Sequence, residues 1–205
     1  MDADSSSWAW GRPQTSPFAH PQGLRGRLAG RFMLWTNQQD EVLDALNVQP
    51  GDRVLEVGYG PGGLLGLLAC STAAAAVLGV DPSPTMRSAA ARANRAAVRS
   101  GRITLGLGTA EHTGLADRSV DRIASVNNVG LWPDLEAGVR ELHRVLRPGG
   151  TVLIAWHGGS SPRRLERRLR LPQDRLARIE GALRHRFTDV TRRELSRLDV
   201  FTAVR

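Results

Sequence analysis

Val54-Leu55-Glu56-Val57-Gly58-Tyr59-Gly60-Pro61-Gly62-Gly63 is the stretch that decides the fold: a short apolar strand that runs into a glycine-rich turn. Glycine lacks a Cβ atom, so its backbone can turn tightly and approach a ligand that other residues would exclude. Gly58, Gly60 and Gly63 also fit the spacing G-x-G-x-x-G, which is typical of loops that bind nucleoside-type cofactors. This spacing alone leaves NAD and S-adenosylmethionine (SAM) open.

Two details of the turn favour SAM. Glu56 precedes the first glycine by two residues, where a carboxylate at a strand tip reaches the crevice, and Pro61 stiffens the turn. The segment 56–62 resembles the first motif of the class I SAM-dependent methyltransferases, E/D-x-G-x-G-x-G. The alternative is a structural strand-to-helix turn in another α/β fold. The resemblance implies that the cofactor contacts Glu56, Gly58, Tyr59, Gly60 and Gly62, with Tyr59 lining the methionine pocket.

Length and composition indicate one globular domain. The chain has 205 residues, of which 41% are hydrophobic, enough for a sizeable core. No apolar run approaches the length of a membrane span, and the first residues carry acids and serines where a signal peptide needs basic and apolar residues. We therefore expect a cytoplasmic protein. The single cysteine, Cys70, lies in a small apolar run and is expected to be a packing residue.

The strongly basic charge raises nucleic acid as a possible partner. The formal net charge is +8, and the sequence contains no lysine, so every basic side chain except histidine is an arginine. Together with the abundance of alanine, this pattern indicates a general compositional bias as much as selection for phosphate contacts. We therefore do not expect nucleic acid as the partner, because net charge indicates nonspecific association and not the fold.

Hydrophobic periodicity predicts alternating strands and helices. The expected strands are 53–57, 75–80, 103–107, 120–126, 151–155 and a closing pair, 187–195 and 200–204. The expected helices are 34–46, 63–70, 83–100, one through Leu135, Val139, Leu142 and Leu146, and an amphipathic segment within 161–186. The family resemblance implies an α/β fold: a Rossmann-like, doubly wound, seven-stranded and mostly parallel sheet with a C-terminal antiparallel hairpin.

The N-terminal residues 1–30 show neither helical nor strand periodicity and are rich in serine, proline and glycine. We expect an irregular arm there, which is either a lid over the ligand or a tail packed on the surface. Residues 31–205 form the expected SAM-binding domain.

Asp81 follows the second expected strand, about twenty residues beyond the glycine turn. A carboxylate at this position accepts hydrogen bonds from ribose hydroxyls in nucleotide-binding α/β folds. Both NAD sites and SAM sites contain such a carboxylate. The segment that follows, beginning with Pro82, resembles the methyltransferase continuation after the ribose-binding acid. We therefore predict that Asp81 binds ribose and that Pro82 adjoins the cofactor.

Two further strand ends carry polar residues. In related methyltransferases the turn after the third strand often reads G-D-A-E, whereas here it reads Gly108-Thr109-Ala110-Glu111. Because a threonine replaces the aspartate, adenine is expected to be held by the Thr109 hydroxyl, the Ala110 backbone or the Glu111 carboxylate. Asn127 and Asn128, after the fourth strand, are expected to hold the methionine part of SAM, to orient a substrate or to form a turn without a ligand contact.

A second motif supports the same family. The segment 141–150, Glu141-Leu142-His143-Arg144-Val145-Leu146-Arg147-Pro148-Gly149-Gly150, is close to E-x-x-R-V-L-x-P-G-G of the small-molecule methyltransferases related to the ubiquinone and menaquinone group. The resemblance implies a structural role for this motif.

The implied reaction, methyl transfer, needs proximity, orientation and exclusion of water more than a dedicated catalytic residue. His157, just beyond the fifth strand, is the candidate general base, and no metal is expected. Tryptophans near the strand ends favour an apolar or aromatic small-molecule substrate. Three alternatives stay open: a SAM-binding enzyme with non-methylating chemistry, an NAD-dependent oxidoreductase, and a nucleic-acid-binding protein with a vestigial cofactor site.

Overall fold

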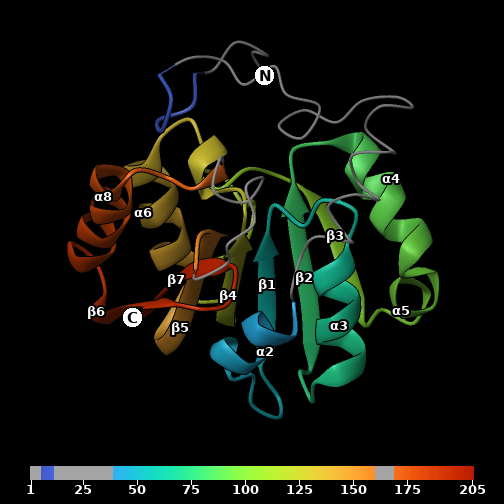
Figure 1. Cartoon of the computed structure of the whole chain (residues 1–205). Helices are drawn as coiled ribbons and strands as arrows, with labels where there is room; N and C mark the ends of the chain where they lie inside the picture. Colours follow the sequence, from blue (N-terminus) through green and yellow to red (C-terminus); the bar gives the residue numbers. More distant parts are fainter. Residues whose placement is uncertain (1–5, 12–38, 160–168) are drawn as a thin grey trace.

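The computed structural model describes residues 6–11, 39–159 and 169–205 (Figure 1). Within these ranges, seven strands form one sheet in the spatial order β3-β2-β1-β4-β5-β7-β6. The strands are β1 (Arg53–Val57), β2 (Ala76–Asp81), β3 (Ile103–Leu107), β4 (Val120–Val126), β5 (Leu146–His157), β6 (Thr188–Glu194) and β7 (Leu198–Val204). The first five pair in parallel, and β7 runs antiparallel to both β5 and β6. The sequence-based prediction of the sheet is confirmed.

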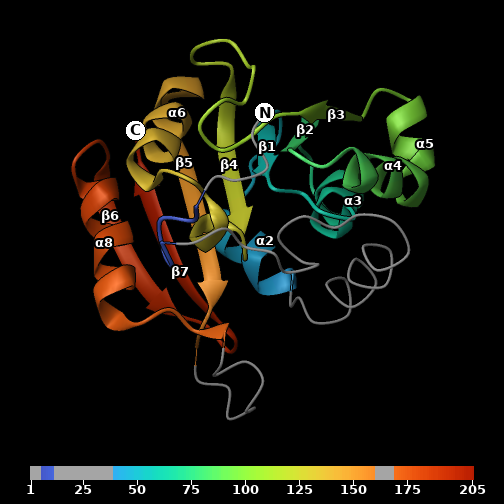
Figure 2. The same cartoon turned by 90° about the horizontal axis from the view of Figure 1, so that it is seen from above.

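The helices cover both faces of the sheet. They are α2 (Asp40–Leu46), α3 (Gly63–Ser71), α4 (Pro84–Ala93), α5 (Arg95–Arg99), the 3-10 turn η1 (Val129–Leu131), α6 (Leu135–Val145) and α8 (Gln173–Arg184). Seen from above, α6 and α8 lie on one side of the strands and α3, α4 and α5 on the other (Figure 2). Each side has its own apolar core, because the central strands bury side chains on both faces.

The order of the strands places a ligand crevice. The chain runs from β1 outward to β2 and β3, then returns to β4 on the other side of β1. Open α/β sheets bind ligands outside the carboxyl ends of their strands at such a switch point. The glycine turn follows β1 and Asn127 follows β4, so both lie at this edge.

Several predicted boundaries needed correction. The helix expected over 83–100 is interrupted at Asn94, where α4 ends and α5 begins, because the Asn94 side chain binds back to the Gly62 carbonyl oxygen at 2.8 Å. The strand expected over 151–155 extends from 146 to 157, with an irregular register against β4. The first helix is described from Asp40, since residues 34–38 lie outside the described ranges. Within 161–186, the described helix is α8, and residues 161–168 lie outside those ranges.

Residues 6–11, the described part of the expected arm, pack against η1 and β5. The Ser7 hydroxyl donates to the Gly130 carbonyl oxygen at 2.6 Å, and the Trp8 indole donates to the Val129 carbonyl oxygen at 2.6 Å. The Trp10 ring lies 5.8 Å from that of Trp156. The rest of the arm falls outside the described ranges, so the lid stays a prediction.

Across residues 6–11, 39–159 and 169–205, no helix combines the length and the apolar character that a membrane crossing requires.

Candidate functional site

The glycine turn closes over the end of β2. The backbone N–H of Gly58 donates to the Val80 carbonyl oxygen at 2.8 Å, and that of Gly62 donates to the Tyr59 carbonyl oxygen at 2.9 Å. Gly58, Gly60 and Gly62 have φ angles of 72°, 52° and 86°. Residues with side chains rarely adopt this left-handed region, which explains three glycines at alternate positions.

Asp81 is bound to this turn. Its Oδ2 accepts a hydrogen bond from the Gly60 N–H at 2.9 Å, and its Oδ1 accepts one from the Ser83 N–H at 2.9 Å. Burial raises the pKa of Asp81 to about 6, although the two backbone donors act in the opposite direction. The carboxylate therefore lies beside the glycine turn, as a ribose ligand would require.

Glu56 is a buried carboxylic acid at the same edge. Its Oε2 has no hydrogen-bond partner among the described residues. Burial, and secondarily the charge of Asp81, raises the pKa of Glu56 well above its usual range, while a hydrogen bond from the Leu65 backbone lowers it. A buried acceptor without a donor is costly, so this position fits a ligand that brings N–H or O–H donors and positive charge. SAM has an ammonium group, a sulfonium and ribose hydroxyls, so the two acids fit it.

The ring of Tyr59 packs against β2 and β3. Its hydroxyl donates to the Gly106 carbonyl oxygen at 3.1 Å, and a Cβ atom at Gly79 would lie 2.6 Å from the ring. The side chain is 2% exposed and belongs to the core beneath the turn. An aromatic side chain here fills the space above the small Gly79. That Tyr59 lines the methionine pocket stays a prediction.

The turn after β3 is folded tightly beside β2. The Thr109 Oγ1 accepts a hydrogen bond from the His112 N–H at 3.2 Å, and Ala110 is buried. The Glu111 Oε1 accepts one from the Asp134 N–H at 3.3 Å, just before α6 begins. Two of the three predicted adenine-side residues thus already hold the turn with their side chains.

An apolar surface adjoins this turn. Leu107, at the end of β3, pairs in register with Asp81 and is 48% exposed. Pro82 is also exposed, directly after Asp81. A planar apolar group can therefore pack beside the Asp81 carboxylate.

The asparagines after β4 have separate roles. Asn127 adopts a left-handed conformation with φ of 57°, and its N–H donates to the Ala155 carbonyl oxygen at 2.8 Å. The Asn128 side chain donates to the Val57 carbonyl oxygen at 2.7 Å and accepts hydrogen bonds from Ser125 and Trp132. Asn128 therefore joins β1, β4 and η1.

Sequence reasoning did not single out Asn94, and it considered Asn128 only together with Asn127 as a possible ligand. Asn94 and Asn128 both hold backbone carbonyls of residues near the glycine turn. Their signal in the sequence is slight, because asparagines are common in turns and helix ends.

His157 ends β5 at the carboxyl edge of the sheet. Its ring contacts that of Trp156 edge to face, with centroids 5.7 Å apart and planes at 80°. Trp156 is buried in the apolar cluster that also contains residues of α6 and α8. Asn127 reaches the same strand end through Ala155, so the predicted base and the predicted cofactor ligand share one edge.

Fold, strand-end chemistry and sequence similarity agree on the class. Residues 55–154 match the family model described as a methyltransferase domain, and the chain belongs to the class I SAM-dependent methyltransferases. Its cofactor is SAM.

Particular relatives cover the chain to different extents. The uncharacterized methyltransferase YdaC of Bacillus subtilis is 32% identical over 129 residues, covering 62% of this chain and 69% of YdaC. The ubiquinone/menaquinone biosynthesis C-methyltransferase UbiE of Geotalea daltonii is 31% identical over 106 residues, 51% of this chain and 45% of UbiE. A SAM-dependent methyltransferase structure from Aquifex aeolicus superposes with a TM-score of 0.68 at 18% identity, covering 87% of this chain and 95% of that chain.

Proposed function

We propose that this methyltransferase transfers the methyl group of SAM to an apolar or aromatic small molecule. The observation that carries the cofactor part is the pair of buried acids, Glu56 and Asp81, at the glycine turn. Two neighbouring buried carboxylates favour a ligand that carries positive charge and hydroxyl donors.

The proposed cofactor contacts follow the switch point of the sheet. Asp81 accepts hydrogen bonds from the ribose hydroxyls, and Glu56 compensates positive charge of the methionine part. The backbones of Gly58, Tyr59, Gly60 and Gly62 line the turn. Pro82, Thr109, Ala110 and Glu111 adjoin adenine, and Asn127 lies at the methionine end. SAM supplies a methyl group already activated on a positive sulfur, so the protein has mainly to orient the acceptor and exclude water.

The proposed acceptor side lies around η1, close to Asn127. Trp10 is 37% exposed and lies over Trp156, and Trp132 is buried between η1 and α6. Aromatic side chains at the rim of a site favour apolar or planar acceptors. The UbiE relative is named for quinone biosynthesis, which is consistent with this class of acceptor.

We propose His157 as the general base when the acceptor is a hydroxyl or a protonated amine. It lies at the strand end that Asn127 also reaches. Replacement of His157 by Gln should lower kcat by about 100-fold with such an acceptor. His185→Gln, at the exposed end of α8, is the matched control and should leave kcat unchanged.

Titration calorimetry with SAM, S-adenosylhomocysteine and NAD tests the cofactor assignment. Asp81→Ala should weaken SAM binding by about 10- to 100-fold, because hydrogen bonds to a charged acceptor are lost. Asp174→Ala, on the exposed first turn of α8, is the control. Binding of NAD and not of SAM would refute the proposed contacts.

The acceptor is found by incubating SAM bearing a labelled methyl group with a panel of phenols, quinols and amines. A product that carries the label supports the proposal. Conversion of a substrate without gain of the label would favour non-methylating chemistry instead.

A further inference from the structure

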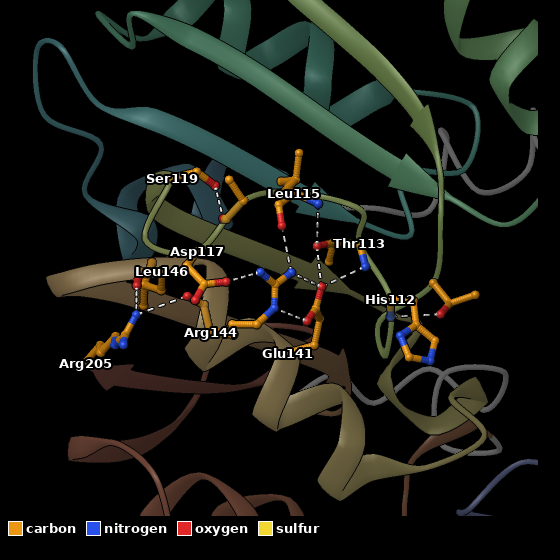
Figure 3. Close-up of polar contacts among 11 residues, drawn as sticks. His112, Thr113, Leu115, Asp117, Ser119, Glu141, Arg144, Leu146 and Arg205 are labelled. Carbon is orange, nitrogen blue, oxygen red and sulfur yellow. Dashed lines mark hydrogen bonds and ion pairs between the residues drawn. The ribbon is translucent and has the colours of Figure 1, made fainter.

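Two charged side chains of α6 bind the segment that joins β3 to β4. Glu141 is buried, and its Oε1 accepts hydrogen bonds from the Thr113 N–H at 2.9 Å and from the Thr113 hydroxyl at 2.6 Å (Figure 3). Arg144 donates to both oxygens of Glu141 at 2.7 Å and to the Leu115 carbonyl oxygen at 2.7 Å. It also forms an ion pair with Asp117. Three points of the segment are thus held by one helix.

The position of Thr113 is transmitted to the turn after β3. A Cβ atom at Gly108 would lie 2.9 Å from the His112 carbonyl oxygen and 3.2 Å from the Thr113 carbonyl oxygen. Residues 112 and 113 therefore lie directly against Gly108, and its N–H donates to the Asp81 carbonyl oxygen at 3.2 Å. The Thr109 N–H donates to the His112 carbonyl oxygen at 3.0 Å, which closes the turn.

The N-terminal end of α6 provides a second attachment. The Asp134 N–H donates to the Glu111 Oε1 at 3.3 Å. One helix therefore holds the turn at Glu111 and, about two helical turns further along, at Thr113. A turn held by the same rigid element at two points keeps one orientation relative to β2.

We propose that Glu141 and Arg144 are positioning residues for the adenine side of the cofactor site. Glu141 fixes Thr113, Arg144 fixes Glu141 and Leu115, and together they set the turn 109–112 beside Asp81. Charge-assisted hydrogen bonds give such a link geometric specificity, whereas a salt bridge by itself adds little to stability. This inference rests on the proposed cofactor contacts of Thr109, Ala110 and Glu111.

The test uses Glu141→Gln, which keeps the side-chain shape but removes the charge that pairs with Arg144. Thr113→Val removes the hydroxyl and retains the backbone hydrogen bond. Glu136→Gln is the matched control, because Glu136 lies on the same helix and pairs with Arg178 away from the turn. All variants are compared well below their midpoints of thermal unfolding.

Calorimetry with S-adenosylhomocysteine and with 5′-methylthioadenosine, which lacks the amino-acid part, gives the decisive measurement. Glu141→Gln should weaken the binding of both ligands by the same factor, about fivefold to tenfold. Thr113→Val should weaken their binding by a smaller factor. Glu141→Gln should also reduce the preference for 5′-methylthioadenosine over 5′-methylthioinosine, whereas a purely structural role of Glu141 would leave this preference unchanged. Glu136→Gln should match the wild-type protein.

Unchanged affinities in Glu141→Gln, or a loss confined to the ligand with the amino-acid part, would overturn the positioning role. Hydrogen exchange of the ligand-free protein separates this failure from failure of the proposed function. Faster exchange of the Thr113 and Leu115 amides is expected in Glu141→Gln and not in Glu136→Gln. If the wild-type protein binds neither ligand, the cofactor contacts and their positioning are both refuted, even where exchange confirms that α6 restrains the turn.

Discussion

The backbone N–H of Gly60 donates to Oδ2 of Asp81 at 2.9 Å and joins the glycine turn after β1 to the end of β2. The carboxylate that the sequence assigns to ribose therefore also stabilises the turn that lies beside the cofactor. A second donor, the Ser83 N–H, occupies the other oxygen. Each carboxylate oxygen has further acceptor capacity, so ribose hydroxyls can bind without displacing either backbone group.

Binding of SAM should depend on pH through Asp81. The pKa of Asp81 is raised to about 6, so below that pH the ligand-free protein carries a proton where ribose binding needs an acceptor. At pH 5 the Kd for SAM should be about tenfold higher than at pH 7.5, as expected for a single proton that must be lost. Calorimetry across this range measures it. Glu56→Gln separates the contribution of Glu56, whose pKa is raised too. A Kd that stays constant from pH 5 to pH 7.5 would contradict the prediction.

Glu141 should stabilise the protein above pH 4.5 and lose this contribution in acid. Its folded pKa is lowered to about 2 from 4.5; burial raises the pKa, but hydrogen bonds from Arg144 and Thr113 outweigh it. The group binds its proton more weakly when folded, so stability is present above the unfolded pKa and falls as pH drops toward 2. Since the Arg144 side chain is 36% exposed and solvent screens the pair, we expect about 1 to 2 kcal/mol.

Denaturant unfolding at several pH values measures this contribution. The difference in unfolding free energy between the wild-type protein and Glu141→Gln should be constant above pH 5 and shrink in more acidic solution. A difference that is independent of pH would show that the charge of Glu141 is not responsible.

Two glycines with the same backbone angle should differ in their tolerance of a methyl group. Gly58 and Gly114 have φ angles of 72° and 73°. A Cβ atom at Gly58 would lie 2.4 Å from Nδ2 of Asn128, whereas one at Gly114 meets nothing within 4 Å. Gly114→Ala should therefore cost about 1 kcal/mol of backbone strain, and Gly58→Ala about 3 kcal/mol or more.

A double mutant identifies the contact. In an Asn128→Ala background, the further cost of Gly58→Ala should fall toward that of Gly114→Ala, because only backbone strain remains. Chemical denaturation gives all four values. Additive costs at positions 58 and 128 would mean that the clash is relieved by movement of the turn.

The attachment of residues 6–11 should contribute measurably to stability. The Ser7 side chain is buried, donates to the Gly130 carbonyl oxygen and accepts from the Ala9 N–H at 3.1 Å. Ser7→Ala should lower the free energy of unfolding by about 1 to 3 kcal/mol, since a buried carbonyl and a buried N–H both lose a partner. Ser100→Ala removes an exposed hydroxyl and should change it by less than about 0.5 kcal/mol. Equal effects of the two substitutions would argue that the segment is not anchored by Ser7.

Several features could be predicted from the sequence because their determinants are local. The run 54–63 encodes a buried strand and a turn that needs left-handed residues, and each of β1, β3 and β4 has its predicted bounds. The position of Asp81 beside the turn could also be inferred, because parallel neighbouring strands bring their carboxyl ends to one edge. The predicted class and cofactor are confirmed.

Other features depend on which side chains meet across the fold. The ring of Tyr59 lies in the core because Gly79, on the adjacent strand, leaves space for it. The break at Asn94 arises because its amide reaches a carbonyl 32 residues away. The link between Glu141 and Thr113 spans 28 residues, so the spacing of Glu141 and Arg144 shows only that they share a helical face.

The sequence by itself determined the order of strands and helices along the chain, the glycine turn and the acid at the end of β2. These features depend on backbone conformation and periodic burial, which neighbouring residues in the chain determine. Only the tertiary structure decided how Asn128 joins β1 to η1, how α6 holds the turn after β3 and where residues 6–11 attach. These contacts join groups far apart in the chain, and a hydrogen bond between them forms only once packing has brought donor and acceptor within about 3 Å.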